Sequence, residues 1–434
     1  MGTNILLYGA TGYSGRLIAA EAKKRKLARD DSTNCRMILA ARDAQALREV
    51  ATKNGMDYRV FGLDDSAEVV RRLAGIKVVL NAAGPFAFTA ERLAGAAIRA
   101  RCHYVDINGE IDVYRKLDDL ALKAWNRQIA LVSGAGAWAG TSDVLLSGAL
   151  EELGREALDE LGRAKAKPLA AIRIALSQIL DFSRGSAASA ARMLREQVLV
   201  VRARAVREPK KAGAAGEPVK AGGAGEPVKE GAVGEPKRLP RKMVYVHEPV
   251  GKIERIFDFG SLVPSRDRLA RGGRDIASAA NMIDTLSAKH TAERYNVIAA
   301  GIETYVQTGS LGRFAYDFAG MASSILTCPY ARGFTQAQMQ LLPEGPTQQE
   351  RSDGRHVVVL EIEDEFHTRV IDWCLETPDV YQLTAQIAVA AARNMASTGF
   401  KKIGWATPAE ALGSTKIQGT AAFDGCRFLR GGAA

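Results

Sequence analysis

Cysteine and histidine are scarce in this sequence and widely spaced. Five of each occur among 434 residues. The cysteines form no CxxC pair and are odd in number, and no two histidines show HxxxH spacing. Neither a disulfide framework nor a metal site is therefore expected. A reducing, cytoplasmic setting fits this cysteine usage best.

Long apolar runs and several catalytic signatures are also missing. No stretch of about 18 or more apolar residues occurs, so we expect no membrane span. The first residues lack the basic and apolar regions of a signal peptide. No GxSxG motif occurs, and no P-loop lysine follows a glycine motif, which argues against a hydrolase of the nucleophile-elbow type and against a nucleoside triphosphatase.

The net charge of +10 does not indicate nucleic-acid binding. Half of the excess lies between Arg204 and Lys242, where ten Lys or Arg and five Glu occur without an aromatic residue. Glu-Pro recurs there at 208, 217, 226 and 235, and this composition buries too little apolar surface to fold. We predict a mobile low-complexity insertion at about 205–241. Its charge suits peripheral association with acidic lipid or protein surfaces, but it lacks the periodic apolar residues of a firm anchor.

Short apolar runs alternate with amphipathic segments over the first 135 residues or so. The expected strands are 4–8, 36–41, 58–61, 78–80, 103–105 and 129–132, and the expected helices are 14–28, 45–54, 66–74, 90–101 and 117–128. Strands that are apolar on both faces and alternate with helices predict a parallel sheet covered on each side. The fold class is therefore α/β, a doubly wound sheet of the Rossmann type.

The pattern changes after about residue 150. We expect a strand at 170–179, a helix at 186–201, a strand near 242–246, a hairpin of 356–362 with 368–372, and a helix at 378–396. The chain then divides into a Rossmann domain at 1–145, an inserted α+β substrate and dimerisation domain at 146–376, and a helix and tail at 377–434 that return to the first domain. A homodimer is the commonest default for such a chain.

A glycine motif stands where the first strand meets the first helix. Glycines in this context permit a tight turn, close approach to a pyrophosphate and tight helix–sheet packing, although a merely tight turn is the alternative. The expected dinucleotide contacts are Gly9, Ala10, Thr11, Gly12, Tyr13, Ser14 and Gly15.

The ends of the second and third strands indicate which dinucleotide is bound. Arg42 follows the second strand, where a guanidinium suits the 2′-phosphate of NADP. The alternative is an exposed arginine with Asp43 as the ribose ligand of NAD. Asp64 follows the third strand and is a candidate for the adenine amine, unless the acids there cap the helix that begins near Ser66.

Two further loops lie at the carboxyl edge of the sheet, where ligands bind in such folds. After the fourth strand, Asn81, Ala82, Gly84, Pro85 and Phe86 are expected beside the nicotinamide, with a core position as the alternative for Phe86. After the fifth strand, the candidates for a catalytic acid are Glu110 and Asp106, followed by His103 and Tyr104. A turn with Asx-type hydrogen bonds is the alternative for this second loop.

Several motifs together resemble one known family. They are Gly9–Gly15, Asn81–Phe86, Tyr104–Glu110, Ser133–Gly136 with Ser142 and Asp143, Ser183–Ser186, Asp379–Tyr381 with Thr384 and Ala385, and Trp405–Ala409 with Ala411–Gly413. In number and order they resemble the saccharopine dehydrogenase-like oxidoreductases, over nearly the whole chain apart from the Glu-Pro insertion. Within that family the pattern is similar to trans-acting enoyl reductases and to the saccharopine dehydrogenase-like proteins of animals.

The resemblance implies a Rossmann domain that binds NAD(P), and hydride transfer to a small-molecule substrate of the enoyl, acyl or carbonyl type. It also implies that Ser183 and Arg184 contact the substrate, since they match a turn of the family. Two other functions stay open. One is an amino-acid imine dehydrogenase of the saccharopine type, and the other is a non-catalytic NADP-binding sensor or scaffold.

Overall fold

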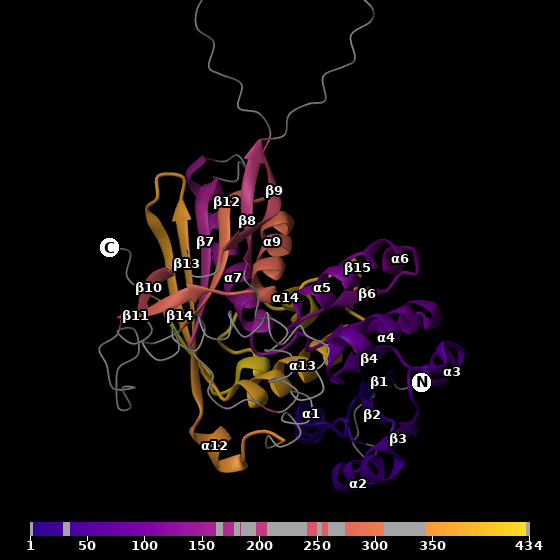
Figure 1. Cartoon of the computed structure of the whole chain (residues 1–434). Coiled ribbons are helices and arrows are strands. Elements are labelled where there is room, and N and C mark those ends of the chain that lie inside the picture. The colour runs from indigo at the N-terminus through magenta and orange to yellow at the C-terminus, as the bar shows by residue number, and fades with distance from the viewer. Residues whose placement is uncertain are drawn as a thin grey trace, which may run out of the picture.

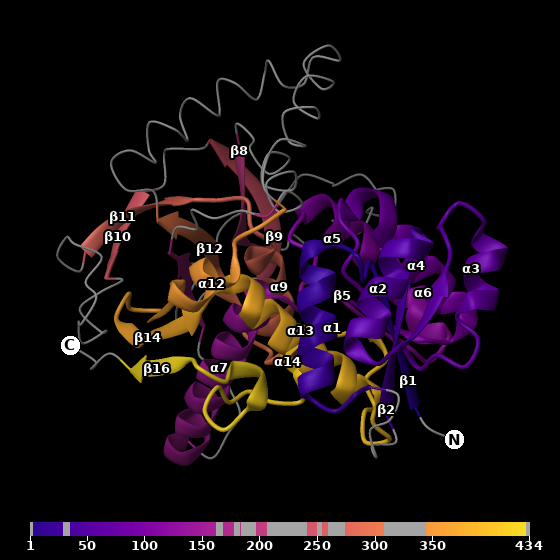
Figure 2. The ribbon, with the colours of Figure 1, turned by 90° about the horizontal axis from the view of Figure 1, so that it is seen from below.

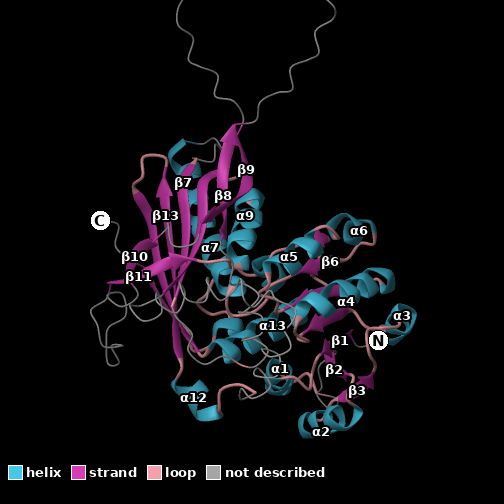
Figure 3. Ribbon diagram, viewed as in Figure 1, coloured by secondary structure: helices cyan, strands magenta, loops and turns pink. Residues whose placement is uncertain are grey.

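The structure is a computed structural model in which two sheets, each packed with helices, lie side by side (Figure 3). It describes residues 3–28, 35–161, 168–177, 183, 197–205, 241–249, 254–258, 274–307 and 344–430. Most of the Glu-Pro segment expected at 205–241 lies outside these ranges. Among the described helices, none combines the length and the hydropathy that crossing a bilayer requires.

The first sheet is parallel throughout and confirms the expected doubly wound fold. Its strand order is β15-β6-β5-β4-β1-β2-β3. The strands are β1 (Thr3–Tyr8), β2 (Cys35–Ala41), β3 (Asp57–Val60), β4 (Val78–Asn81), β5 (His103–Asp106), β6 (Ala130–Val132) and β15 (Gly404–Trp405). The helices after them are α1 (Tyr13–Lys24), α2 (Ala44–Asn54), α3 (Ser66–Arg72), α4 (Phe86–Ala100), α5 (Ile111–Asp118) and α6 (Ala121–Asn126).

Helix α1 shows how the sequence pattern produces this packing. Gly15, Ile18, Ala19 and Ala22 recur at the spacing of one helical face, and all four are buried. The single helix expected at 117–128 is wrong, because the chain forms two helices there. Helix α5 begins at Ile111 and buries the apolar face formed by Val113, Tyr114 and Leu117. A turn at 119–120 separates it from α6.

The second sheet has nine strands, of which all neighbouring pairs except β7 and β12 are antiparallel. Its path is β10-β11-β12-β7-β13-β14-β16, and β8 pairs with β12 and β9. The strands are β7 (Leu169–Leu176), β8 (Gln197–Ala205), β9 (Arg241–Pro249), β10 (Glu254–Asp258), β11 (Arg274–Ala279), β12 (Ala299–Gln307), β13 (Arg355–Asp364), β14 (Arg369–Pro378) and β16 (Arg427–Arg430). Helices α7 (Ala139–Leu161) and α9 (Ile283–Arg294) pack together beside this sheet (Figure 1).

The helix expected at 186–201 is wrong for its last five residues, which are the part that the structure describes. The helix expected at 186–201 ends in strand β8 from Gln197 onward, and residues 186–196 lie outside the described residues. Val198, Val200 and Val201 are all buried, so both faces of this segment are covered. β-Branched residues buried on alternating faces favour a strand. The hairpin expected at 356–372 is confirmed as β13 and β14.

The chain after the hairpin belongs to both halves of the molecule. Helix α13 (Val380–Ala396) packs along α1 (Figure 2). Strand β15 then joins the edge of the first sheet, helix α14 (Pro408–Leu412) follows, and after the short helix η1 (Ala421–Phe423) strand β16 joins the second sheet. Helix α12 (Gln348–Asp353), which precedes β13, lies toward the α1 side of the molecule.

Candidate functional site

The glycine turn between β1 and α1 is shaped by two close contacts within the chain. Gly9 has φ of +88°, and a Cβ there would lie 2.6 Å from the backbone nitrogen of Ala83. A Cβ on Gly15 would lie 2.1 Å from the carbonyl oxygen of Gly9. Neither position has room for a side chain. The packing of the protein itself therefore accounts for the first and the third glycine of the motif.

The second glycine is different, because none of the described residues crowds it. Gly12 is exposed, its φ of −71° suits any residue, and a Cβ there would meet only the Gly9 oxygen, at 3.4 Å. Gly12 is also the N-cap residue of α1, and among the described residues no side chain caps that helix. The backbone N–H groups at the start of α1 are therefore available to an anion that approaches the open face of Gly12.

The neighbouring helices of the sheet have side-chain oxygens at their first turns. Asp43 accepts hydrogen bonds from two N–H groups of α2, and Asp65 does the same for α3. At α4, Glu110 Oε1 accepts from the N–H of Phe86 at 3.2 Å. Of the four helices that follow β1 to β4, α1 is thus the one that side chains of the described residues leave uncapped.

The candidates for the adenosine end lie at the ends of β2 and β3. Arg42 is exposed at the end of β2, and its charge acts on the Tyr8 phenol, whose pKa burial raises and Arg42 lowers. Asp43 Oδ1 accepts both capping hydrogen bonds of α2, and the Arg42 side chain beside it is exposed. Asp64 is 94% exposed and pairs with Arg92 at 2.9 Å, whereas the cap of α3 is Asp65.

The loop after β4 lies against the glycine turn. Asn81 is buried, and its Oδ1 accepts a hydrogen bond from the N–H of Ala83 at 3.0 Å. Gly84 is exposed and joined to Pro85 by a cis peptide bond, and Ala82 is buried beside Gly9. Phe86 begins α4 and packs in the hydrophobic core of this domain, which is the core position considered as its alternative.

A buried hydrogen-bond network joins the ends of β5 and β6. Its centre is Asp106, whose Oδ2 accepts from the Tyr104 hydroxyl at 2.9 Å. The Oδ1 atom accepts from Ser133 Oγ at 2.9 Å, from the N–H of Gly134 at 3.0 Å and from the N–H of Asn108 at 3.1 Å. Burial raises the pKa of Asp106 to about 6, and these hydrogen bonds oppose the rise. Asp106 thus holds the two strand ends together.

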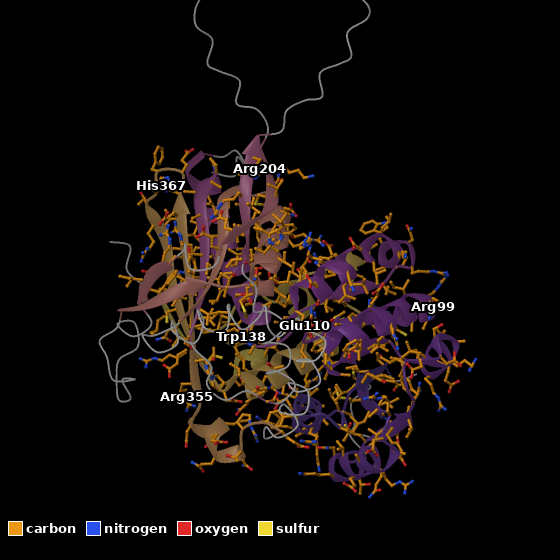
Figure 4. All side chains as sticks on the ribbon, in the orientation of Figure 1. Arg99, Glu110, Trp138, Arg204, Arg355 and His367 are labelled. Atoms are coloured by element: carbon orange, nitrogen blue, oxygen red, sulfur yellow. The ribbon has the colours of Figure 1, made fainter. Side chains whose placement is uncertain are left out.

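The network continues to β4 and to Glu110. Asn81 Nδ2 donates to the Tyr104 hydroxyl at 3.1 Å, and Asn108 Oδ1 accepts from the N–H of Glu110 at 2.8 Å. Two successive Asx-type turns therefore shape the loop at Asp106 and at Asn108. Glu110 is buried at the start of both α4 and α5, and Figure 4 labels it, with Trp138, where the two halves of the molecule meet.

A second cluster of polar side chains is buried where α7 packs on α9. Asp284 Oδ1 accepts from Ser142 Oγ at 2.6 Å, and its Oδ2 has no hydrogen-bond partner among the described residues. Asp143 accepts from Thr291 Oγ1 and from the N–H of Ala409. Burial raises the pKa of both carboxyls to about 6, and the charge of Asp143 raises that of Asp284 further.

We expect Asp284→Asn to stabilise the protein more at pH 7.5 than at pH 4.5. The pKa of Asp284 is higher in the folded than in the unfolded chain, so its cost to stability grows as pH rises from about 4 to 6 and is complete above that range. Removing the charge should therefore raise the unfolding free energy by roughly 2 kcal/mol more at the higher pH. Urea unfolding at both values measures this, with the exposed Asp353→Asn as the control. An equal effect of Asp284→Asn at both values would contradict it.

Contacts between distant segments surround the glycine turn, and sequence reasoning missed them. The Tyr13 hydroxyl donates to the Pro346 carbonyl at 2.6 Å, and its ring meets that of Tyr381 edge-on, with centroids 5.1 Å apart. The Tyr381 hydroxyl in turn accepts from the N–H of Ser183. Ser183 therefore contacts Tyr381, which in turn contacts Tyr13 of the glycine turn. Arg184 lies outside the described residues. No local pattern signals pairs this far apart along the chain.

Comparison with known families agrees with this geometry. Residues 5–132 match the family model described as the saccharopine dehydrogenase NADP binding domain. The amino-terminal domain is therefore similar to the NADP-binding domain of saccharopine dehydrogenases. The resemblance seen in the sequence motifs is thereby confirmed, and the match covers β1 to β6, including the glycine turn and the loops after β4 and β5.

Curated relatives are similar to about a quarter of the chain. The chain is 34% identical over 121 residues to the trans-acting enoyl reductase of Mycobacterium ulcerans (strain Agy99), and 35% identical over 122 residues to that of Mycobacterium leprae (strain TN). Each match covers 27% of this chain and 28% of the relative. The chain therefore matches little more than a quarter of the length of these relatives.

Solved structures resemble the whole chain in fold. Saccharopine dehydrogenase (L-Glu forming) of Saccharomyces cerevisiae has a TM-score of 0.53 at 13% identity, covering 95% of this chain and 96% of that one. The homospermidine synthase of Legionella pneumophila, in complex with NAD, has a TM-score of 0.58 at 10% identity, covering 99% and 91%. The second sheet is therefore part of a fold shared with saccharopine dehydrogenase.

Proposed function

We propose that this protein is an NADP-dependent oxidoreductase of the saccharopine dehydrogenase type. The observation that carries the proposal is Gly12, an exposed glycine without a structural requirement at the uncapped start of α1. Glycine at this position lets a diphosphate approach the backbone N–H groups closely. The description of the matching family, an NADP binding domain, supports the same function.

The polar groups around the turn fit a nicotinamide dinucleotide from end to end. The start of α1 would hold the diphosphate, with Ala10, Thr11 and Ser14 around it. Arg42 would bind the 2′-phosphate by charge-assisted hydrogen bonds, which favours NADP over NAD. Asp64, exposed beyond β3, would lie near the adenine. The open loop at Gly84 and Pro85, with Asn81 and Ala82 behind it, would border the nicotinamide.

The residues at the far end of the site would handle the substrate. When bound, the cofactor supplies a hydride to an acceptor. We propose that Glu110 exchanges the proton that accompanies reduction, and that Asp106 positions it through Asn108. Ser183 and Arg184 would contact the substrate. Since the curated relatives are enoyl reductases, an enoyl, acyl or carbonyl acceptor is the substrate class we propose.

Titration with NADPH and NADH, followed by an acceptor panel, tests this function. We expect NADPH to bind more tightly than NADH and to be oxidised by at least one enoyl or carbonyl compound. Oxidation by imines alone would instead support a saccharopine-type amino-acid dehydrogenase. Tight binding without any turnover would support a sensor or scaffold, and the absence of binding by either nucleotide would refute the proposal.

A further inference from the structure

A short segment before β13 lies against the glycine turn, and we call residues 344–351 the strap. The Tyr13 hydroxyl accepts a hydrogen bond from Arg351 Nη1 at 2.8 Å and donates one to the Pro346 carbonyl. A Cβ on Gly345 would lie 2.6 Å from the Tyr13 ring. The strap therefore fits closely around a side chain that belongs to the glycine motif.

The strap also supplies the partner of a cation beside the turn. Arg16 lies in the second turn of α1, and long helical side chains lean toward the start of their helix. Its Nη1 donates to the Thr11 carbonyl at 2.7 Å, which places the guanidinium beside the turn. Its Nη2 pairs with Glu344. The side chains of Arg16 and Glu344 are 39% and 63% exposed, so a ligand can reach both.

The chemistry of this pair is that of anion recognition. The first turn of α1 contains no acidic residue and no side-chain cap, so Glu344 is a carboxylate that a distant segment brings to this positive end of the helix. A phosphate oxygen is a stronger partner than a carboxylate oxygen at an exposed site, because it also meets the free N–H groups of the helix.

We propose that Arg16 binds the diphosphate of the dinucleotide, and that Glu344 holds its guanidinium until the dinucleotide displaces the carboxylate. This inference rests on the proposed function. Arg16 keeps its bond to Thr11, while Nη2 exchanges Glu344 for a phosphate oxygen. The strap stays in place through Tyr13 and Arg351, so only the carboxylate has to move. Glu344 is then an internal competitor of the cofactor.

Binding of NADP⁺ and of adenosine 2′-monophosphate to matched variants tests the exchange. Glu344→Gln should tighten NADP⁺ binding about two- to fivefold, the range that an exposed ion pair contributes. Arg16→Ala should weaken it roughly tenfold or more, as loss of a charged hydrogen bond does. Neither change should alter binding of adenosine 2′-monophosphate, which lacks the diphosphate. Asp353→Asn removes a negative charge from the neighbouring helix α12 without touching Arg16, and it should leave NADP⁺ binding unchanged.

The outcomes separate this inference from the function on which it rests. If the unchanged protein binds neither nucleotide, both are wrong. Suppose instead that it binds NADP⁺ and adenosine 2′-monophosphate. If Glu344→Gln then changes the affinity for NADP⁺ no more than Asp353→Asn does, or lowers it, only the exchange of Glu344 for a phosphate oxygen is refuted. Arg16→Lys keeps the positive charge and should retain most of the affinity for NADP⁺. A loss of adenosine 2′-monophosphate binding in Arg16→Ala would mean that the residue only shapes the turn.

Discussion

Replacing Gly12 by alanine should lower the affinity for NADPH on the order of 100-fold while leaving the fold intact. The added methyl group would lie 3.4 Å from the Gly9 oxygen, its closest contact with another segment of the described residues, so the fold accommodates it. It would, however, occupy the exposed face through which a diphosphate reaches the N–H groups of α1. Loss of charge-assisted hydrogen bonds there corresponds to about 3 kcal/mol. Calorimetric titration and thermal unfolding of the same sample measure the two effects.

Gly15→Ala is the matched control, because its main effect should be a loss of stability of the fold. Its methyl group would lie 2.1 Å from the Gly9 oxygen and 2.9 Å from the Cα of Ala10. The helix and the turn cannot both keep their positions, so we expect a loss of stability of about 1–3 kcal/mol or more. If Gly12→Ala bound NADPH as well as the unchanged protein, the proposed diphosphate site would be wrong.

Replacing Arg42 by alanine should weaken NADPH binding roughly 30- to 100-fold and change NADH binding little. The guanidinium is the exposed cation at the end of β2, and Asp43 beside it is engaged as the cap of α2. A 2′-phosphate would therefore lose a charged partner worth about 2–3 kcal/mol, while a 2′-hydroxyl would not. Fluorescence titration with both nucleotides gives the ratio directly.

Arg36→Ala provides the control for Arg42→Ala. Arg36 is exposed on the same strand, but it lies at the amino-terminal end, away from the edge where ligands bind. Its replacement removes one positive charge without touching the proposed site. Equal effects of the two substitutions on NADPH would show that only net charge matters, and Arg42 would then not be the residue that selects the cofactor.

The first domain was predictable because most of its strands are buried on both faces and because its turns contain characteristic residues. The glycines of the first turn, the apolar run at β4 and the amphipathic spacing in α1 are all local signals. The division between α5 and α6 is not predicted, because the apolar face of α5 begins at Ile111, directly after the candidate site loop, where no side chain of the described residues caps the helix to mark its start.

The candidate site was predictable only as far as single loops allow. Sequence placed Asp106 and Glu110 together, but it did not show that Asp106 accepts four hydrogen bonds from β5 and from the loops after β5 and β6. The contacts of Tyr13 with Pro346 and Arg351 join residues more than 300 positions apart. Such partners depend on how the second domain returns to the first, which no periodicity encodes.

The order in which strands are added to the two sheets determines which strand edges are unpaired during translation. Strand β15 lies at one edge of the first sheet and β16 at one edge of the second, and both come from the segment after α13. On the ribosome, neither strand can pair until that segment has emerged. Because open strand edges invite association with other chains, the emerging chain exposes the edges of β6 and β14 until then.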